Sequence, residues 1–307
     1  TAGEITLGAP ITVNALTFNT NGYSISGTGG NILTLAGTTP TITVTTGTST
    51  ISAVLAGSAG LTKSGAGALY LTGANTFSGG ITLSGGTLQA SNDAALGAIG
   101  NAITTTADAT LTIDSGSTNR TVTIGAGTTL TLNGAGAGSA LLTGSGNLNA
   151  FFGTTLSNDN NDFTGTVTLS GWYGNTGSIY FTSVRNVGEP SSLGAGGTIT
   201  FTRGDGQDLI RYIGDGDVSN RDWVMEGGGL RRFLNEGTGT LSLSGGFNLA
   251  QSTQFQAVNA DFELLGILSG GAPAVTFVAG ADRSITLAGA NTFTGNVTLS
   301  GGGVINA

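Results

Sequence analysis

Short alternating strands separated by glycine are the dominant pattern of this chain. In residues 69–90, LYLTGANTFSGGITLSGGTLQA, apolar side chains recur two positions apart, at Leu69 and Leu71 and again at Ile81 and Leu83. This period places them on one side of a strand and their polar neighbours on the other. Glycines follow the strands, where tight turns require a positive φ at low steric cost. The pattern predicts short β-strands, each with one buried face.

The same unit of strand and turn recurs along the chain. Residues 285–302, ITLAGANTFTGNVTLSGG, match residues 69–86 at 12 of 18 positions, and residues 155–171 contain a degenerate copy, NDFTGTVTLSG. One copy cannot bury its apolar side alone, so it must stack on neighbours of the same shape. Repetition of one unit favours a solenoid over a sandwich, which has no reason to reuse one pattern. We therefore expect an all-β chain in which residues 1–307 form one continuous, elongated β-solenoid.

Composition supports ordered β-structure and removes several function classes. Gly accounts for 56 of 307 residues, while charged residues make up 8%, against about 25% in globular proteins. A disordered chain would be more charged and less apolar than this one, whose mean hydropathy is +0.21. No apolar run approaches the about 18 residues that would span a bilayer, so we expect no membrane insertion.

The absence of two residue types restricts the chemistry further. The chain contains neither cysteine nor histidine, which excludes disulfides, a Ser-His-Asp triad and the usual zinc sites. The net charge of −8 argues against a nucleic-acid partner, which requires a basic face. Lys63 and Ser64 are neighbours on one strand and point to opposite faces, so they do not form a catalytic pair. We expect no enzymatic activity and no cofactor.

A family resemblance rests on residues 61–97, which begin LTKSGAGALYLTGANTFSGG. This stretch resembles the passenger-associated repeat of bacterial autotransporters and related large surface proteins. The second clear copy covers residues 285–307, and residues 209–223, LIRYIGDGDVSNRDW, resemble a sequence found between such repeats. The resemblance implies a right-handed parallel β-solenoid in an extracellular, secreted or surface-attached protein. It does not imply an enzyme, because most members of the family carry the repeat as a stalk.

Two stretches depart from the repeat. Residues 172–190 predict a longer loop, and residues 203–236 hold five of the nine basic and seven of the seventeen acidic residues. Carboxylates in this charged segment are candidate ligands of a calcium ion, because hard cations prefer oxygen; they are Asp205, Asp208, Asp215 and Asp217. Their spacing does not reproduce the tandem repeat of calcium-binding solenoids. The alternative is that Asp and Gly form turns while Asp and Arg pair on a solvated face.

The first and last strands provide a candidate interface. A solenoid end presents unpaired backbone groups and apolar side chains that a further coil would cover. The residues expected to stack there are Ile5, Leu7, Ile11, Val297, Leu299, Val304 and Ile305. The partner would be a second copy of the chain, in a head-to-tail filament, or a neighbouring segment of a longer surface stalk.

We therefore predict a structural, extracellular protein of the cell surface. One alternative is a β-helix that binds or cleaves polysaccharides, in a groove lined by residues 205–223 or 172–180. Another is an adhesin with residues 172–190 as its contact loop, and both alternatives have glycans as partners.

Overall fold

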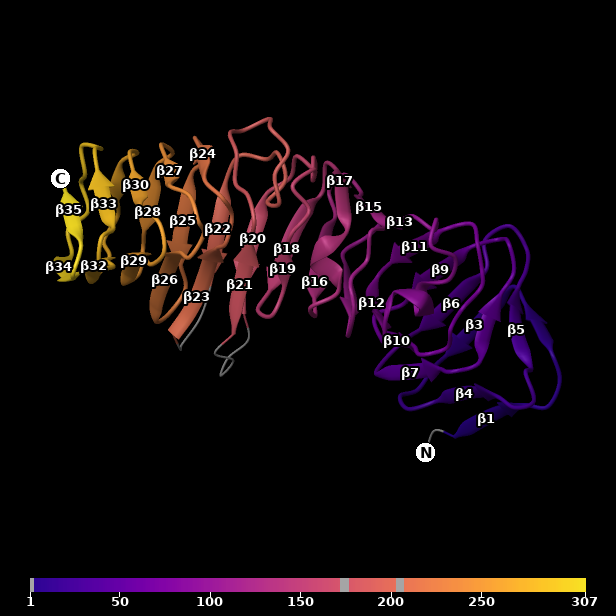
Figure 1. The fold of residues 1–307 in the computed structure, drawn as a ribbon. Coiled ribbons are helices and arrows are strands. Elements are labelled where there is room, and N and C mark those ends of the chain that lie inside the picture. Colours follow the sequence, from indigo (N-terminus) through magenta and orange to yellow (C-terminus); the bar gives the residue numbers. More distant parts are fainter. Residues whose placement is uncertain (1–2, 172–176, 203–206) are drawn as a thin grey trace. The chain divides into compact units, whose positions relative to one another are not determined.

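The protein consists of short parallel strands stacked coil on coil (Figure 1). The computed structural model describes residues 3–171, 177–202 and 207–307, with the backbone alone at 207 and 208. These residues divide into two compact units, residues 1–146 and 147–307. Every strand pairing given below is parallel, so the all-β solenoid expected from the sequence is confirmed. None of the helices in the described part of the chain is long and apolar enough to cross a membrane.

The first unit contains three sheets, one on each side of the coil. The first sheet has the order β1 (Glu4–Leu7), β4 (Ser24–Gly27), β7 (Thr48–Ile51), β10 (Ala68–Leu71), β12 (Gly86–Ala90), β14 (Ala109–Ile113) and β16 (Thr129–Asn133). The second has the order β3 (Ala15–Phe18), β6 (Thr41–Val44), β9 (Leu61–Ser64), β11 (Ile81–Ser84), β13 (Ile103–Thr105), β15 (Thr121–Ile124) and β17 (Leu141–Gly144). The third is β2 (Ile11–Val13), β5 (Ile32–Leu35) and β8 (Val54–Ala56). Two short 3-10 helices, η1 (Asp93–Leu96) and η2 (Ala137–Ser139), follow strands of the first sheet.

The second unit repeats the arrangement. Its first sheet is β18 (Asn147–Phe151), β20 (Val167–Ser170), β22 (Ile199–Thr202), β25 (Trp223–Glu226), β28 (Phe247–Leu249) and β31 (Leu268–Ser269). The second is β19 (Thr155–Leu156), β21 (Ser178–Phe181), β23 (Gln207–Tyr212), β26 (Leu230–Asn235), β29 (Thr253–Ala257), β32 (Ala274–Ala279) and β34 (Asn296–Gly301). The third is β24 (Asp217–Ser219), β27 (Leu241–Leu243), β30 (Phe262–Leu264), β33 (Ser284–Leu287) and β35 (Val304–Asn306).

In-register columns of apolar side chains form the core of each unit. In the first unit, Leu88 pairs with Leu111, which pairs with Leu132, and all three are fully buried. In the second unit the corresponding columns are aromatic, and the rings of Phe255 and Phe277 stack with centroids 5.8 Å apart. Because strands are about 4.8 Å apart, each coil buries its inward side chains only when a coil lies on each side of it.

Glycine is required where a turn passes close to the coil below. At Gly86, φ is +63°, and a Cβ atom would lie 2.3 Å from the carbonyl oxygen of Gly65. Both the backbone conformation and the contact exclude a larger residue there. The glycine pairs that punctuate the sequence therefore allow successive turns to stack closely.

The repeated Asn-x-Phe segment fastens one coil to the next. Asn75 accepts a hydrogen bond from the backbone N–H of Leu55 (2.8 Å) and donates one to the carbonyl of Ala95 (2.6 Å), which lie about one coil away in each direction. Phe77 is fully buried. In the degenerate copy, Asn161 donates to the carbonyl of Ser192 (3.1 Å).

Copies of this segment lie on different sides of the coil. In the second unit, residues 157–166 follow β19 and precede β20, whereas residues 288–295 follow β33 and precede β34. The first copy therefore connects the second sheet to the first, and the other connects the third sheet to the second. The repeat is thus a local module of two strands and a bridge, and its length does not set the length of a coil.

One expected loop covers other residues than predicted. Residues 178–181 form β21, which pairs with β19 and β23, so the assignment of all of residues 172–190 to a loop is wrong there. Ile179 and Phe181 alternate inward and are fully buried, which keeps this segment in the sheet. The observed loop covers residues 182–198, and residues 172–176 lie outside the described part of the chain.

Candidate functional site

The expected stacking residues belong mostly to strands that are paired on one side. At one end of the second unit, β34 pairs with β32 and β35 pairs with β33. Val297 and Leu299 continue the columns of Val275 and Phe277, which are fully buried. Val297 and Leu299 themselves are 52% and 59% exposed. Their strand register places both side chains in line with the core, but no further coil covers them, so both are exposed.

The remaining residues expected at this end differ in direction. Ile305 continues the column of the fully buried Ile285 and is half-buried. Val304 pairs instead with the half-buried Ser284 and is 57% exposed, so it lies on the outer face. Val304 therefore adds apolar area beside the stacking face and does not extend the core.

The first strands of the first unit show the same relationship. Ile5 pairs with the buried Ile25 and Ile11 with the buried Leu33, yet Ile5 and Ile11 are 45% and 43% exposed. Leu7, in contrast, is 3% exposed, so it contributes little area to a stacking face. A hollow beside Ile5 is lined by further apolar and polar side chains, namely Leu16, Thr17, Phe18, Asn19, Thr20 and Tyr23.

The four candidate calcium ligands are only partly described. Asp205 lies outside the described residues, and only the backbone of Asp208 is described, in β23. Asp215 is exposed in the turn before β24, whereas Asp217 lies within β24. Among the described residues no group of three carboxylates is placed to hold a metal ion. The calcium site therefore stays a prediction.

Asp217 takes part in a local polar network. Its Oδ2 accepts hydrogen bonds from the Tyr212 hydroxyl (3.0 Å) and the backbone N–H of Val184 (3.1 Å), and its Oδ1 lies 3.8 Å from Nε of Arg185. Burial raises the pKa of Asp217 above its ordinary value and, together with the Asp217 charge, raises the pKa of Tyr212. This network connects the loop of residues 182–198 to the coil that follows it.

The loop of residues 182–198 is closed at its neck. Ser192 donates from its N–H to Oγ of Ser183 and from its own Oγ to the carbonyl of Ser183, both at 2.7 Å. Near the loop tip, Val187 is 53% exposed, and its N–H donates to Oδ1 of Asn220 (2.8 Å). A groove beside the loop is lined by Arg185, Asn186, Glu189, Gly216, Asp217, Val218, Thr240 and Ser242.

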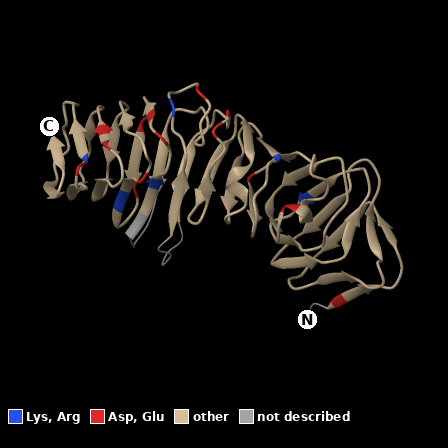
Figure 2. Ribbon diagram, viewed as in Figure 1, with Lys and Arg blue, Asp and Glu red and all other residues tan. Residues whose placement is uncertain are grey.

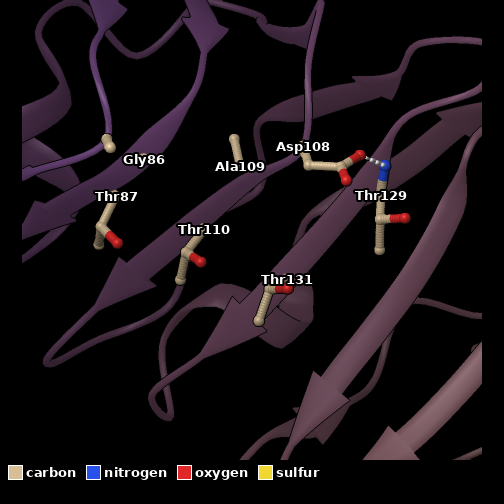
Figure 3. A pocket seen from close by; sticks show the side chains of 8 residues that line it. Gly86, Thr87, Asp108, Ala109, Thr110, Thr129 and Thr131 are labelled. Carbon is tan, nitrogen blue, oxygen red and sulfur yellow. Dashed lines mark hydrogen bonds between the residues drawn. The ribbon is translucent and has the colours of Figure 1, made fainter.

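A second groove lies on the outer face of the first unit (Figure 3). Thr87, Thr110 and Thr131 are in-register neighbours on β12, β14 and β16. The groove holds one carboxylate, Asp108, whose Oδ1 accepts a hydrogen bond from the backbone N–H of Thr129 (2.7 Å). Its lining thus consists of short hydroxyl side chains and one carboxylate already in use.

Sequence reasoning missed four buried cations of the described residues that bind backbone carbonyls, namely Lys63, Arg120, Arg221 and Arg231, the last of which donates to the carbonyl of Glu226. Lys63 points inward in β9 and is fully buried, and its Nζ donates to the carbonyls of Ser64, Gly65 and Gly85 at 2.9–3.1 Å. Burial lowers the pKa of Lys63 to about 8. The three bonds stabilise the ammonium group without a carboxylate and fix the turn after β9 against the turn after β11.

Arg120 and Arg221 perform this role in the two units. Arg120 donates to the carbonyls of Gly97 (2.9 Å) and Ala98 (2.6 Å), and Arg221 donates to that of Leu193 (2.9 Å). Burial lowers the pKa of Arg221 to about 10. Each Arg follows Asn in a short motif, Thr-Asn-Arg at 118–120 and Ser-Asn-Arg at 219–221. That shared triplet was the sequence signal that would have revealed them.

The partners of these two arginines differ at one position. Arg120 also donates from Nε and Nη2 to the carboxylate of Asp93 (2.7 and 3.2 Å). Aligning Leu96-Gly97 with Leu193-Gly194 places Pro190 where Asp93 stands. Nη2 of Arg221 is accordingly a buried donor without a partner among the described residues.

Comparisons with known proteins agree with this fold and its repeats. The family described as passenger-associated-transport-repeat matches residues 61–90 and 284–305. The whole chain is similar to "Adhesin BmaC autotransporter" of Brucella suis biovar 1 (strain 1330), with 44% identity over 333 residues, and it spans 9% of that relative's length. No solved structure matches the chain.

These matches confirm the resemblance found in the sequence. The chain carries two copies of the passenger-associated-transport-repeat, and over its whole length it is similar to an autotransporter adhesin.

Proposed function

We propose that this chain is a non-enzymatic, extracellular stalk segment of a bacterial surface adhesin, in which each end coil stacks on a neighbouring coil. The observation that carries the proposal is the exposure of core positions. Val297 and Leu299 lie in register with fully buried residues one coil earlier and are more than half exposed themselves. A further coil would bury them, and would also pair the free edge of β34.

The apolar gain from such stacking is substantial. Burying one aliphatic side chain of this size contributes about 1.5–3 kcal/mol, and each end offers at least two that are about half exposed. Backbone hydrogen bonds along the new strand pair add direction and register. The relative's much greater length supports a segment that neighbours other coils of the same polypeptide. A head-to-tail filament of separate copies would use the same two faces.

Self-association of the isolated chain tests whether these faces stack. We expect concentration-dependent head-to-tail oligomers in sedimentation velocity, because the faces have no other cover. Leu299→Lys should abolish them, since a charge on the stacking face would be desolvated. Thr298→Lys is the matched control, because Thr298 lies on the same strand and pairs with the half-buried, outward Thr276.

The outcome also separates the two forms of the proposal. Weak association that requires high protein concentration supports the stalk segment, whereas long polymers at low concentration support a filament subunit. A chain that remains monomeric at every concentration, or an equal effect of both lysine variants, would exclude stacking through β34.

A further inference from the structure

The outer face of β21, β23, β26 and β29 carries the most unusual surface of the second unit. Figure 2 shows Lys and Arg positions on the neighbouring strands β23 and β26. Most of the described cations elsewhere bind backbone carbonyls inside the coil, whereas Arg211 and Arg232 project from the outside of a sheet. Their direction follows from alternation, because Arg231 and Phe233 on either side of Arg232 are fully buried.

Strand register brings these side chains together. Arg211 pairs with Tyr180 on one side, and Arg232 pairs with Gln254 on the other. Arg211 and Arg232 lie on adjacent strands and are offset by two positions, since Arg211 itself pairs with Leu234. Strands about 4.8 Å apart therefore place an aromatic ring, two guanidinium groups and an amide on one continuous face.

The two guanidinium groups differ in their binding partners. Arg211 forms an ion pair with Glu236, donates to Oγ of Ser178 (2.9 Å) and lies 5.7 Å from the centroid of the Tyr180 ring. Arg232 has no hydrogen bond or ion pair with any of the described residues, and its Nε is a buried donor without a partner. The residue as a whole is half-buried, so a ligand on this face would bind the other N–H groups of the guanidinium rather than the buried Nε.

The neighbouring amides extend the polar face. Nε2 of Gln254 donates to Oε1 of Gln256 (3.1 Å), which orients both side chains. Oε1 of Gln254 and Nε2 of Gln256 form no hydrogen bond with a described residue, and this acceptor and donor are a pair suited to hydroxyl groups. Tyr180 is half-buried and adds an apolar ring surface.

We propose that this face, the β23–β26 face, binds a carboxylated polysaccharide, with Arg232 holding a uronate carboxylate and Tyr180 and the glutamines contacting the sugar rings. The planar guanidinium fork matches a carboxylate in a bidentate pair. An acidic peptide fits less well, because peptides add to sheets at free edges and these strands are paired on both sides. The proposal goes beyond the stalk function and does not depend on stacking at the ends.

Oligogalacturonate is the probe that tests this proposal, measured by isothermal titration calorimetry at low salt with the whole chain. We expect binding that weakens as salt is added, because exposed charges are screened. Arg232→Gln should reduce affinity about tenfold or more, the scale of a charge-assisted hydrogen bond. Arg283→Gln is the matched control, since Arg283 is exposed in a turn outside this face, and it should leave the affinity unchanged.

Further variants and probes test which groups of the polysaccharide the face binds. Tyr180→Ala should weaken binding several-fold, and the methyl ester of the same oligosaccharide should not bind. Equal loss from both Arg variants, equally tight binding of polyglutamate, or binding of a sulfated glycan that carries no carboxylate in place of the uronate would overturn the proposal, as would no binding at all. Arg232→Gln removes no hydrogen bond or ion pair among the described residues, so its fold, checked by circular dichroism, should be that of the parent chain.

Discussion

Arg120 and Asp93 form a nearly buried ion pair that connects two coils, with Nε 2.7 Å from Oδ1. The same guanidinium binds the carbonyls of the turn after η1, so it joins the carboxylate and the turn in one network. The turn after η1 lies outside the strands, and Arg120 holds it in place by binding its carbonyl groups. Arg120 stabilises the stack without adding apolar area.

Removing this cation should destabilise the chain strongly. Arg120→Met leaves a carboxylate and several carbonyls without donors, which should reduce the free energy of unfolding by about 3–5 kcal/mol. Asp93→Asn keeps an acceptor for the guanidinium and should cost less. Urea denaturation measures both, with the exposed Arg283→Met as the control. Equal stability of the Arg120 and Arg283 variants would show that the network contributes nothing.

Copies of the repeat should differ in their sensitivity to truncation. Phe163 is fully buried, so Phe163→Ala should cost about 3–5 kcal/mol, through lost transfer free energy and the cavity left behind. Phe293, at the same motif position in the last copy, is only half-buried. Phe293→Ala should cost clearly less. A comparison of the two unfolding free energies tests this, and equal losses would contradict the assignment of β34 to an uncovered end coil.

Stability should depend on pH through Lys63. Its pKa is about 8 in the folded chain against an ordinary value of 10.5, so between these values the unfolded chain binds more protons than the folded one. The free energy of unfolding should therefore rise with pH above about 8, by at most about 1.4 kcal/mol per pH unit. Urea denaturation at pH 7, 8 and 9 measures this rise.

Lys63→Met isolates that contribution. The variant cannot titrate, so the difference in unfolding free energy between parent and variant should increase with pH over this range. A difference that stays constant from pH 7 to 9 would show that Lys63 keeps its ordinary pKa in the folded chain.

The sequence predicted the strands well because their cause is local. Alternation at Ile81 and Leu83 corresponds to β11, and the copies at Asn75 and Asn161 occur as equivalent bridges. The family and the solenoid architecture followed from the same repeat. These features depend on neighbours in the chain, which the sequence displays directly.

The buried cations and the neighbours across strands could not be predicted in this way. They depend on contacts between coils about twenty residues apart, which the alternation of apolar and polar residues does not show. Lys63 is buried because turn carbonyls from two coils surround its amine, although a lone lysine between Thr62 and Ser64 reads as a surface residue. The pairing of Tyr180 with Arg211 likewise joins strands that the loop of residues 182–198 and β22 separate in the chain. Residues 178–181 belong to a strand for the same reason, because their partners in β19 and β23 are distant in the chain.

Hydrogen exchange at β34, followed over a range of protein concentrations, tests the stacking claim most directly. If an end coil covers β34, its backbone amides should become protected as concentration rises, while those of the doubly paired β32 should not change. In Leu299→Lys, β34 should stay unprotected at every concentration. Exchange at β34 that is independent of concentration in the parent chain would contradict the account.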